Sequence, residues 1–168
     1  MNKTLLASSL LLSLTVSLQA GNDFGNIDGD ARMVHLVDST GADNGAEASA
    51  TGMSLFTKYT SPEIYQTSFT LGARAVSQVY ENSAEGSITS LGLVNIQENK
   101  EKDILALALA NISYKTDDLT IRIGNQTLES PNVSADDVRL MPNYFQALYL
   151  EYWPLDSVMI AAAHVTAM

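Results

Sequence analysis

The sequence predicts an all-β protein whose antiparallel strands follow one another up and down. Apolar and polar residues alternate with a period of two in several segments, and the connections between these segments are alternately long and short. Aromatic residues also gather beside the connections. Together these features favour a transmembrane β-barrel of porin type. About seven such strands can be identified in the chain.

Residues 1–20 have the three parts of a secretory signal peptide. Lys3 supplies a positive charge, an apolar run extends from Leu5 to Val16, and Ala20 is a small residue at the expected cleavage position. The apolar run is too short for a membrane-spanning helix. We therefore expect export, cleavage after Ala20, and a porin β-barrel domain over residues 21–168.

Seven segments of the mature chain are predicted as strands. The clearest is 65–79, where odd positions are mostly apolar and even positions are polar or small, with Val76 as the exception. Residues 104–115 alternate Leu and Ala, which also suits a helix, but polar residues continue the alternation at the end of the segment. The other predicted strands are 27–37, 50–60, 119–125, 145–153 and 157–167.

The predicted connections alternate in length along the chain. Short turns fall at 61–63, 116–118 and 154–156, and long connections fall at 38–49, 80–103 and 126–144. In an up-and-down arrangement, successive connections lie at opposite ends of the strands. One rim would therefore carry only short turns and the other only long loops, which is typical of outer-membrane barrels.

Aromatic residues lie near both predicted rims. Two belts of such residues are expected where a barrel crosses the two membrane interfaces. Aromatic residues also favour strand ends and cores in soluble sheets, so the belts do not decide the class alone. The residues near the short turns are Tyr59, Tyr65, Tyr114, Tyr152 and Trp153, and those near the long loops are Tyr80, Tyr144 and Phe145.

Composition argues against several classes of function. Acidic residues outnumber basic ones, 19 to 9, which argues against a nucleic-acid binder. The chain has no Cys, so no disulfide framework or thiolate metal site is expected. His35 and His164 accompany neither a G-x-S-x-G motif nor a metal-ligand spacing. We expect no enzyme activity, no metal and no cofactor.

Four arginines are the candidate pore-lining and substrate-steering residues. Arg32, Arg74 and Arg122 fall on the more polar faces of their strands, and Arg139 falls in the connection 126–144. Inside a barrel the first three would point into the lumen, since a charge on the lipid face at mid-depth costs about 2–4 kcal/mol. A guanidinium offers a planar, bidentate site for a carboxylate.

The connection 126–144 is longer than a hairpin requires. Pro131 and Pro142 lie within it, and Asp136 and Asp137 lie close to Arg139. In a pore, this charged stretch would set a transverse field on a passing solute. The alternative is a turn held by Asx hydrogen bonds, with a surface ion pair of little energetic weight.

At RIGNQTLESPNVSADDVRLMPNYFQ the sequence resembles the OprD-type family of outer-membrane porins. The resemblance rests on Arg122 with Gly124, Pro131 with Val133, and the run from Asp136 to Phe145, and it extends to about residue 166 through a P-L-D turn and AAHVT. Leu128 stands where the family usually has proline, and Ala147 where glycine is common.

The resemblance implies a barrel with more strands than this chain supplies, so we expect the chain to be an incomplete N-terminal segment of a porin, with about seven strands. It also implies a specific function. The connection 126–144 would fold inward as the constriction loop, formed in part by Pro131, Asp136, Asp137 and Pro142. Arginines of the wall would form a basic track for small solutes such as amino acids, peptides or organic acids, which cross by passive diffusion without a cofactor. The expected surroundings are outer-membrane lipid, and a homotrimer is expected for the full-length protein.

Two other interpretations remain open from the sequence. One is a secreted β-sandwich used for adhesion or ligand binding. The other is a small eight-stranded outer-membrane barrel that does not conduct, with residues 88–96 as its eighth strand.

Overall fold

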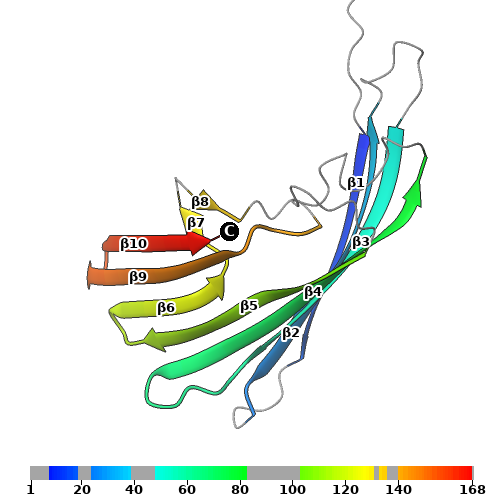
Figure 1. Cartoon of the computed structure of the whole chain (residues 1–168). Helices are drawn as coiled ribbons and strands as arrows, with labels where there is room; N and C mark the ends of the chain where they lie inside the picture. Colours follow the sequence, from blue (N-terminus) through cyan, green and yellow to red (C-terminus); the bar gives the residue numbers. More distant parts are fainter. Residues whose placement is uncertain are drawn as a thin grey trace, which may run out of the picture.

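The computed structural model describes residues 8–18, 24–38, 48–82, 103–130, 133–135 and 140–167, and the regular elements within these ranges are all β-strands. Eight strands form one antiparallel sheet. They are β1 (Ser8–Leu18), β2 (Asn26–Asp38), β3 (Ala48–Thr60), β4 (Thr67–Glu81), β5 (Asp103–Lys115), β6 (Leu119–Gln126), β9 (Phe145–Leu155) and β10 (Val158–Ala167). Their order in the sheet is their order in the chain (Figure 1).

The prediction of an all-β, up-and-down sheet is confirmed. The seven predicted strands correspond to β2 through β6, β9 and β10, and every boundary agrees within two residues. The remaining strands, β7 (Glu129–Ser130) and β8 (Val133–Ser134), form a separate hairpin inside the predicted long loop.

Residues Ser8–Leu18 form a strand that the sequence did not predict. They were assigned to the signal peptide, but in the structure they pair with β2 from Ser8 opposite Val37 to Leu18 opposite Ile27. A run of Leu, Val, Ser and Thr suits an extended strand, and the free edge of β2 offers it backbone partners. Cleavage after Ala20 concerns processing and stays a prediction.

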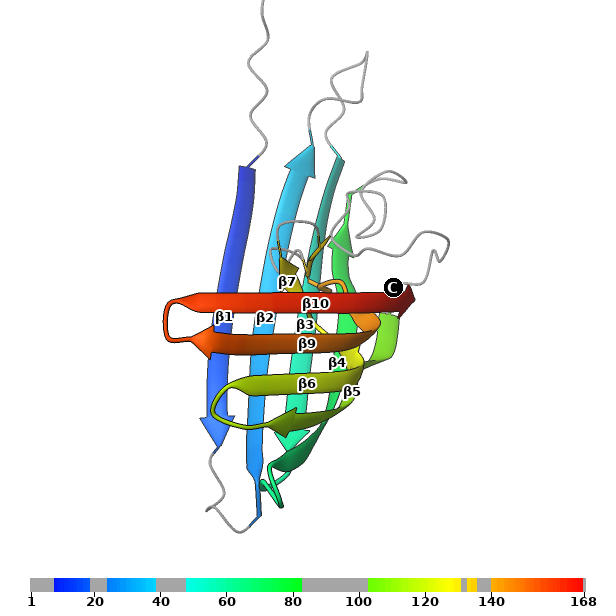
Figure 2. The same ribbon diagram turned by 90° about the vertical axis from the view of Figure 1, so that its left-hand side faces the viewer.

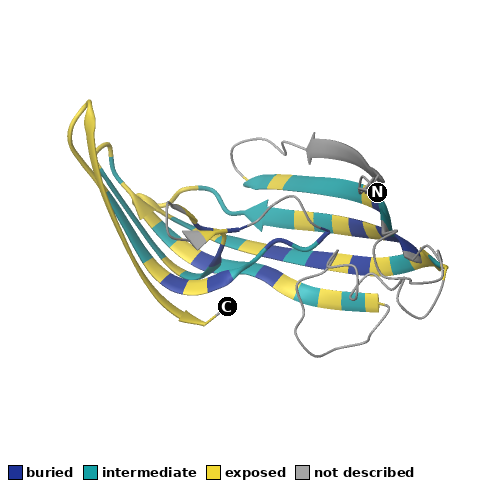
Figure 3. Cartoon of the chain, turned by 90° about the horizontal axis from the view of Figure 1, so that it is seen from above, coloured by how far each residue is buried: buried dark blue, intermediate teal, exposed yellow. Residues whose placement is uncertain are grey.

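The sheet is strongly curved but open. Figure 2 shows β9 and β10 running across the direction of β1 and β2, and Figure 3 shows the sheet from above as a curved trough. Within the described residues, β1 and β10 form the two edges and do not pair with each other. The described strands therefore form an open sheet and not a closed barrel, because closure needs enough strands to bring the two edges together.

Two turns differ in detail from the sequence prediction. Tyr65 and Gln66, predicted to begin a strand, instead form a two-residue hairpin turn with φ values of 50° and 64°. Ile64 and Thr67 close this turn through two backbone hydrogen bonds of 2.9 and 3.0 Å. The last predicted turn is also shorter, since β9 continues through Pro154 and Leu155.

The two faces of the sheet have opposite character, and we call them concave and convex. Cross-strand pairing places Arg32 opposite Ser54 on the concave face, and Met33 opposite Met53 on the convex face. The alternation shifts in β5, because a bulge at Ala108 leaves Leu107 opposite Ala73 and Leu109 opposite Gly72.

Two small hydrophobic clusters lie on the concave face. Val34, Ala50, Val76 and Leu140 form one cluster, and Leu128, Phe145 and Ala147 form the other. Each joins strand residues to a residue of the 127–144 connection. By contrast, all of β10 and the far half of β9 are exposed (Figure 3).

Candidate functional site

The concave face carries a row of three side chains at its centre. Pairing places Asp30 of β2 opposite Phe56 of β3, and Phe56 opposite Arg74 of β4. The Arg74 guanidinium lies over the Phe56 ring, 4.7 Å from its centroid. It reaches across the ring to Asp30, with Nη2 at 3.0 Å from Oδ2 and Nη1 at 3.3 Å from Oδ1. This is the bidentate geometry that a guanidinium favours.

Arg74 is buried, with only 2% of its surface exposed. Its Nη1 also donates to the Ser54 hydroxyl at 3.0 Å and to the Leu140 carbonyl at 3.2 Å. Its Nε donates to the Tyr144 hydroxyl at 3.0 Å. Burying a charge is costly unless it is paired and hydrogen-bonded, and Arg74 meets both conditions.

Arg32 lies on the same face as Arg74 and shares its carboxylate. Its Nε donates to Asp30 Oδ1 at 2.9 Å. A third ion pair joins Lys58 to Asp28 at 3.5 Å. On the concave face, these two side chains are one position nearer to the short turns than Phe56 and Asp30. The concave face is therefore lined by charges of both signs rather than by arginines alone.

Arg122 of β6 has a different environment. Its guanidinium lies 5.5 Å from the centroid of the Tyr149 ring, and its Nη1 donates to Gln126 Oε1 at 3.3 Å. Among the described residues, no carboxylate forms an ion pair with it. Nearby Glu151 instead accepts hydrogen bonds from Tyr149 and Trp153, each at 2.6 Å.

Part of the predicted constriction loop packs on the concave face. Leu140 and Pro142 are buried, and Tyr144 bonds to Arg74. The other candidate residues of this loop, Pro131, Asp136, Asp137 and Arg139, lie outside the described residues, as does the segment 88–96.

Glu129 organises the start of this connection. Its carboxylate accepts from the Ser134 hydroxyl at 3.1 Å and from the Ala135 amide at 3.0 Å. The Ala135 carbonyl in turn accepts from the Asn143 amide at 2.6 Å. These bonds tie the β7–β8 hairpin to the segment that leads into β9.

The convex face is apolar and exposed. One row crosses β4, β5, β6 and β9, and each of its members is at least 44% exposed: Phe69, Ile112, Ile123 and Leu148. Leu55, Leu105 and Leu107 add exposed fractions of 62%, 81% and 61%. Soluble monomers rarely expose large contiguous apolar patches.

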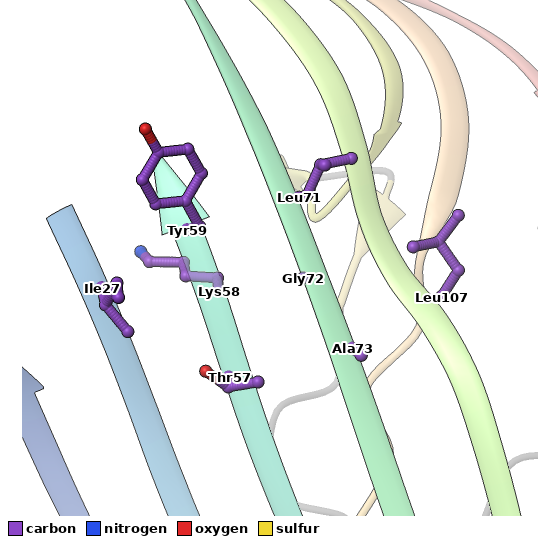
Figure 4. Close-up of a pocket in the computed structure, with 8 residues that line it drawn as sticks. All are labelled: Ile27, Thr57, Lys58, Tyr59, Leu71, Gly72, Ala73 and Leu107. Atoms are coloured by element: carbon purple, nitrogen blue, oxygen red, sulfur yellow. The ribbon is translucent and has the colours of Figure 1, made fainter. Parts of the chain in front are cut away.

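A shallow groove of about 280 Å³ lies near the short-turn end of the sheet. Tyr59, Leu71 and Leu107 project beside it from three neighbouring strands (Figure 4). Its other lining residues are Ile27, Thr57, Lys58, Gly72 and Ala73. The groove is shallow and open, and its lining is mostly apolar.

The two predicted aromatic belts have different outcomes. Tyr59, Tyr114 and Tyr152 lie on the convex face near the short turns, as strand pairing requires. At the long-loop end, Tyr144 and Phe145 face the concave side instead. The second belt is therefore not formed by these two residues, because the connection that carries Tyr144 folds back over the sheet.

The sequence did not identify Asp30, Ser54 or Tyr144 as partners of an arginine. For Ser54 and Tyr144 the sequence offered no indication. For Asp30 it offered one, because residues two positions apart in a strand lie on the same face, which places Asp30 beside Arg32. His35 bonds to the Thr51 hydroxyl at 2.8 Å, and no group of three His, Asp or Glu side chains among the described residues is placed to hold a metal ion.

Comparisons with protein-family models, with curated proteins and with solved structures gave no match. The resemblance to OprD-type porins therefore depends on the residues of this sequence alone. No helix in the described ranges has the length and apolar character needed to cross a membrane.

Proposed function

We propose that this chain is part of an outer-membrane β-barrel of porin type, which lets small hydrophilic solutes cross by passive diffusion. The observation that carries the proposal is the distribution of side chains between the two faces. Large apolar residues such as Leu55 and Leu107 are exposed on the convex face, whereas Asp30, Arg74 and Arg122 lie on the concave face. Contact with lipid outside and water inside favours this arrangement.

Within this proposal, Arg122 and Arg32 steer solutes that carry a carboxylate. Arg122 is half-buried, and its fork bonds only to a neutral amide and an aromatic face among the described residues. Such a guanidinium keeps the capacity to bind a carboxylate. Amino acids, peptides and organic acids are the solutes that the family resemblance suggests.

The proposal requires more wall than the described sheet provides. An open strand edge does not occur within the hydrocarbon region, because its backbone groups would have no hydrogen-bond partners. Additional strands must therefore complete the barrel beside the edges of this sheet. We infer that they come from a longer polypeptide, which assembles as a homotrimer in the outer membrane.

Two measurements on the native protein test the proposal. The protein should fractionate with the outer membrane and need detergent for extraction, and the purified protein should give stepwise conductance in planar lipid bilayers. Recovery as a water-soluble monomer would contradict the membrane assignment and favour a secreted β-sandwich.

A small barrel without conductance is the second candidate. In this candidate, residues 88–96, which lie outside the described residues, supply the eighth strand beside β2 to β6, β9 and β10. The observation in its favour is that buried Leu140 and Arg74 fill part of the concave side. A folded, detergent-extracted product of this length that shows no conductance would support this candidate over the porin.

A further inference from the structure

Arg74 connects two parts of the chain that strand pairing does not connect. Two of its hydrogen-bond acceptors, Asp30 and Ser54, belong to strands β2 and β3. The other two, the Leu140 carbonyl and the Tyr144 hydroxyl, belong to the segment 140–144 that crosses the concave face. The guanidinium of Arg74 therefore joins the sheet to this segment.

The burial of Arg74 separates it from the other arginines of the wall. With 2% of its surface exposed, its guanidinium is not accessible to a solute. Its charge is balanced by Asp30, and its fixed planar fork directs the remaining N–H groups toward Ser54, Leu140 and Tyr144. The chemistry fits a fixed anchor rather than a solute-binding group.

We propose that Arg74 is a positioning residue that holds the segment 140–144 on the concave face. Asp30 keeps the guanidinium oriented, and the Leu140 carbonyl and Tyr144 hydroxyl are the groups it holds. The position of this segment sets the free cross-section beside the wall, and this last consequence rests on the proposed pore function. The anchor itself does not depend on conductance.

Hydrophobic packing offers a competing account of the same placement. Leu140 is fully buried against Val34, Ala50 and Val76, and this contact also favours the docked position. The two accounts differ in what Tyr144 does. If packing alone holds the segment, removal of the Tyr144 hydroxyl leaves it docked, whereas an Arg74 anchor loses one of its two contacts to the segment.

A single introduced thiol can report on this segment, because the chain has no Cys. In Leu140→Cys, measured in detergent on the full chain, the thiol should react slowly with a maleimide. Adding Arg74→Gln should speed the reaction by about tenfold or more, and adding Tyr144→Phe by about threefold, since local opening exposes the site. Met141→Cys is a second reporter in case Leu140→Cys loosens the segment by itself.

Two controls separate the anchor from general destabilisation. Ala108→Cys places the thiol at a fully buried position of β5, a strand outside the segment 140–144, and its reaction rate should not change with Arg74→Gln. Lys58→Gln removes a charge of the same sign from the concave face and should leave the thiol at position 140 slow. Equal acceleration at positions 108 and 140 would overturn the proposal. An unchanged rate at position 140 with Arg74→Gln, or with Tyr144→Phe, would overturn it too.

Conductance tests the consequence separately. If the protein conducts, Arg74→Gln should change the open-channel conductance, whereas Lys58→Gln should have a smaller effect. An absence of conductance in the unmodified protein would refute the pore and leave the labelling result to decide on the anchor.

Discussion

Asp30 on β2 accepts two hydrogen bonds from Arg74 on β4, across the intervening strand β3. The pair is joined over the ring of Phe56, and Asp30 also accepts from Arg32 at 2.9 Å. A carboxylate that serves two guanidiniums, one of them buried, has a larger structural role than a surface ion pair.

Asp30→Asn should lower the free energy of unfolding by about 3 kcal/mol, because it leaves the buried Arg74 charge without its counter-ion. The asparagine keeps the shape of the side chain, so the effect reports on charge. Denaturant titration in detergent, followed by loss of β-sheet circular dichroism, measures the change.

Asp28→Asn is the matched control for this measurement. Its ion pair with Lys58 is longer, at 3.5 Å, and more exposed. We expect a change of about 0–1 kcal/mol, as for exposed pairs. Equal losses in both variants would contradict the role assigned to Asp30.

Much of the sheet was predictable because each signal was local. The period-2 alternation located seven strands, and the order of short and long connections fixed their up-and-down arrangement. The pairing of Ser8–Leu18 was missed because the same apolar run also satisfies the signal-peptide pattern. The bulge at Ala108 was missed because Leu and Ala alternate on both sides of it. No change in residue type therefore indicates that the alternation of faces shifts there.

The site was less predictable, because its contacts are distant in the chain. Arg74 was assigned to the polar face correctly, but its partners lie 44, 20, 66 and 70 residues away. The periodicity of a strand does not indicate which residues of a long connection will pack on the sheet. This packing decides whether Arg74 contacts solvent or is covered by the segment 140–144.

Leu107→Lys tests whether the convex face contacts lipid. Leu107 is 61% exposed near the middle of β5, so in a water-soluble protein the change should alter stability by less than about 0.5 kcal/mol. In a lipid-facing position it should cost about 2–4 kcal/mol. Reversible unfolding from lipid vesicles measures the difference.

Thr120→Lys is the control on the opposite face. Thr120 pairs with Glu151 on β9 and with Lys115 on β5 on the concave side, so a lysine there faces one charge of each sign. We expect it to be neutral in the same vesicles. A neutral Leu107→Lys would remove the main support for the membrane assignment.

Gly124→Ala should weaken the pairing of β5 with β6. Gly124 has a φ of +121°, and an added Cβ would overlap the backbone carbonyl of Ala110. We expect a loss of at least about 2 kcal/mol from strain and displaced backbone. Asn125→Ala, at the next position, should change stability by less than about 0.5 kcal/mol. Thermal melting in detergent compares the two, and similar melting temperatures would argue against this backbone geometry.

Tyr65→Asn should stabilise the hairpin between β3 and β4. Tyr65 adopts a left-handed φ of 50°, a region that asparagine tolerates better. Its side chain is 93% exposed, so the substitution removes few contacts. We expect a gain of about 0.5–1 kcal/mol in detergent. Ile64→Asn, at a neighbouring exposed position outside the left-handed region, should give no gain. Stabilisation by both variants would point to solubility rather than backbone conformation as the cause.

Under the proposed pore function, Arg122→Gln should reduce the preference for carboxylate solutes. The change removes the guanidinium that lies over Tyr149 while keeping a polar side chain beside Gln126. We expect the anion-to-cation permeability ratio to fall by about two- to threefold, measured from reversal potentials in salt gradients. Arg122→Lys separates charge from geometry, because lysine keeps the charge but loses the planar fork. It should retain the ratio for chloride and lose discrimination between carboxylates and chloride. If both variants match the unmodified protein, Arg122 does not steer solutes.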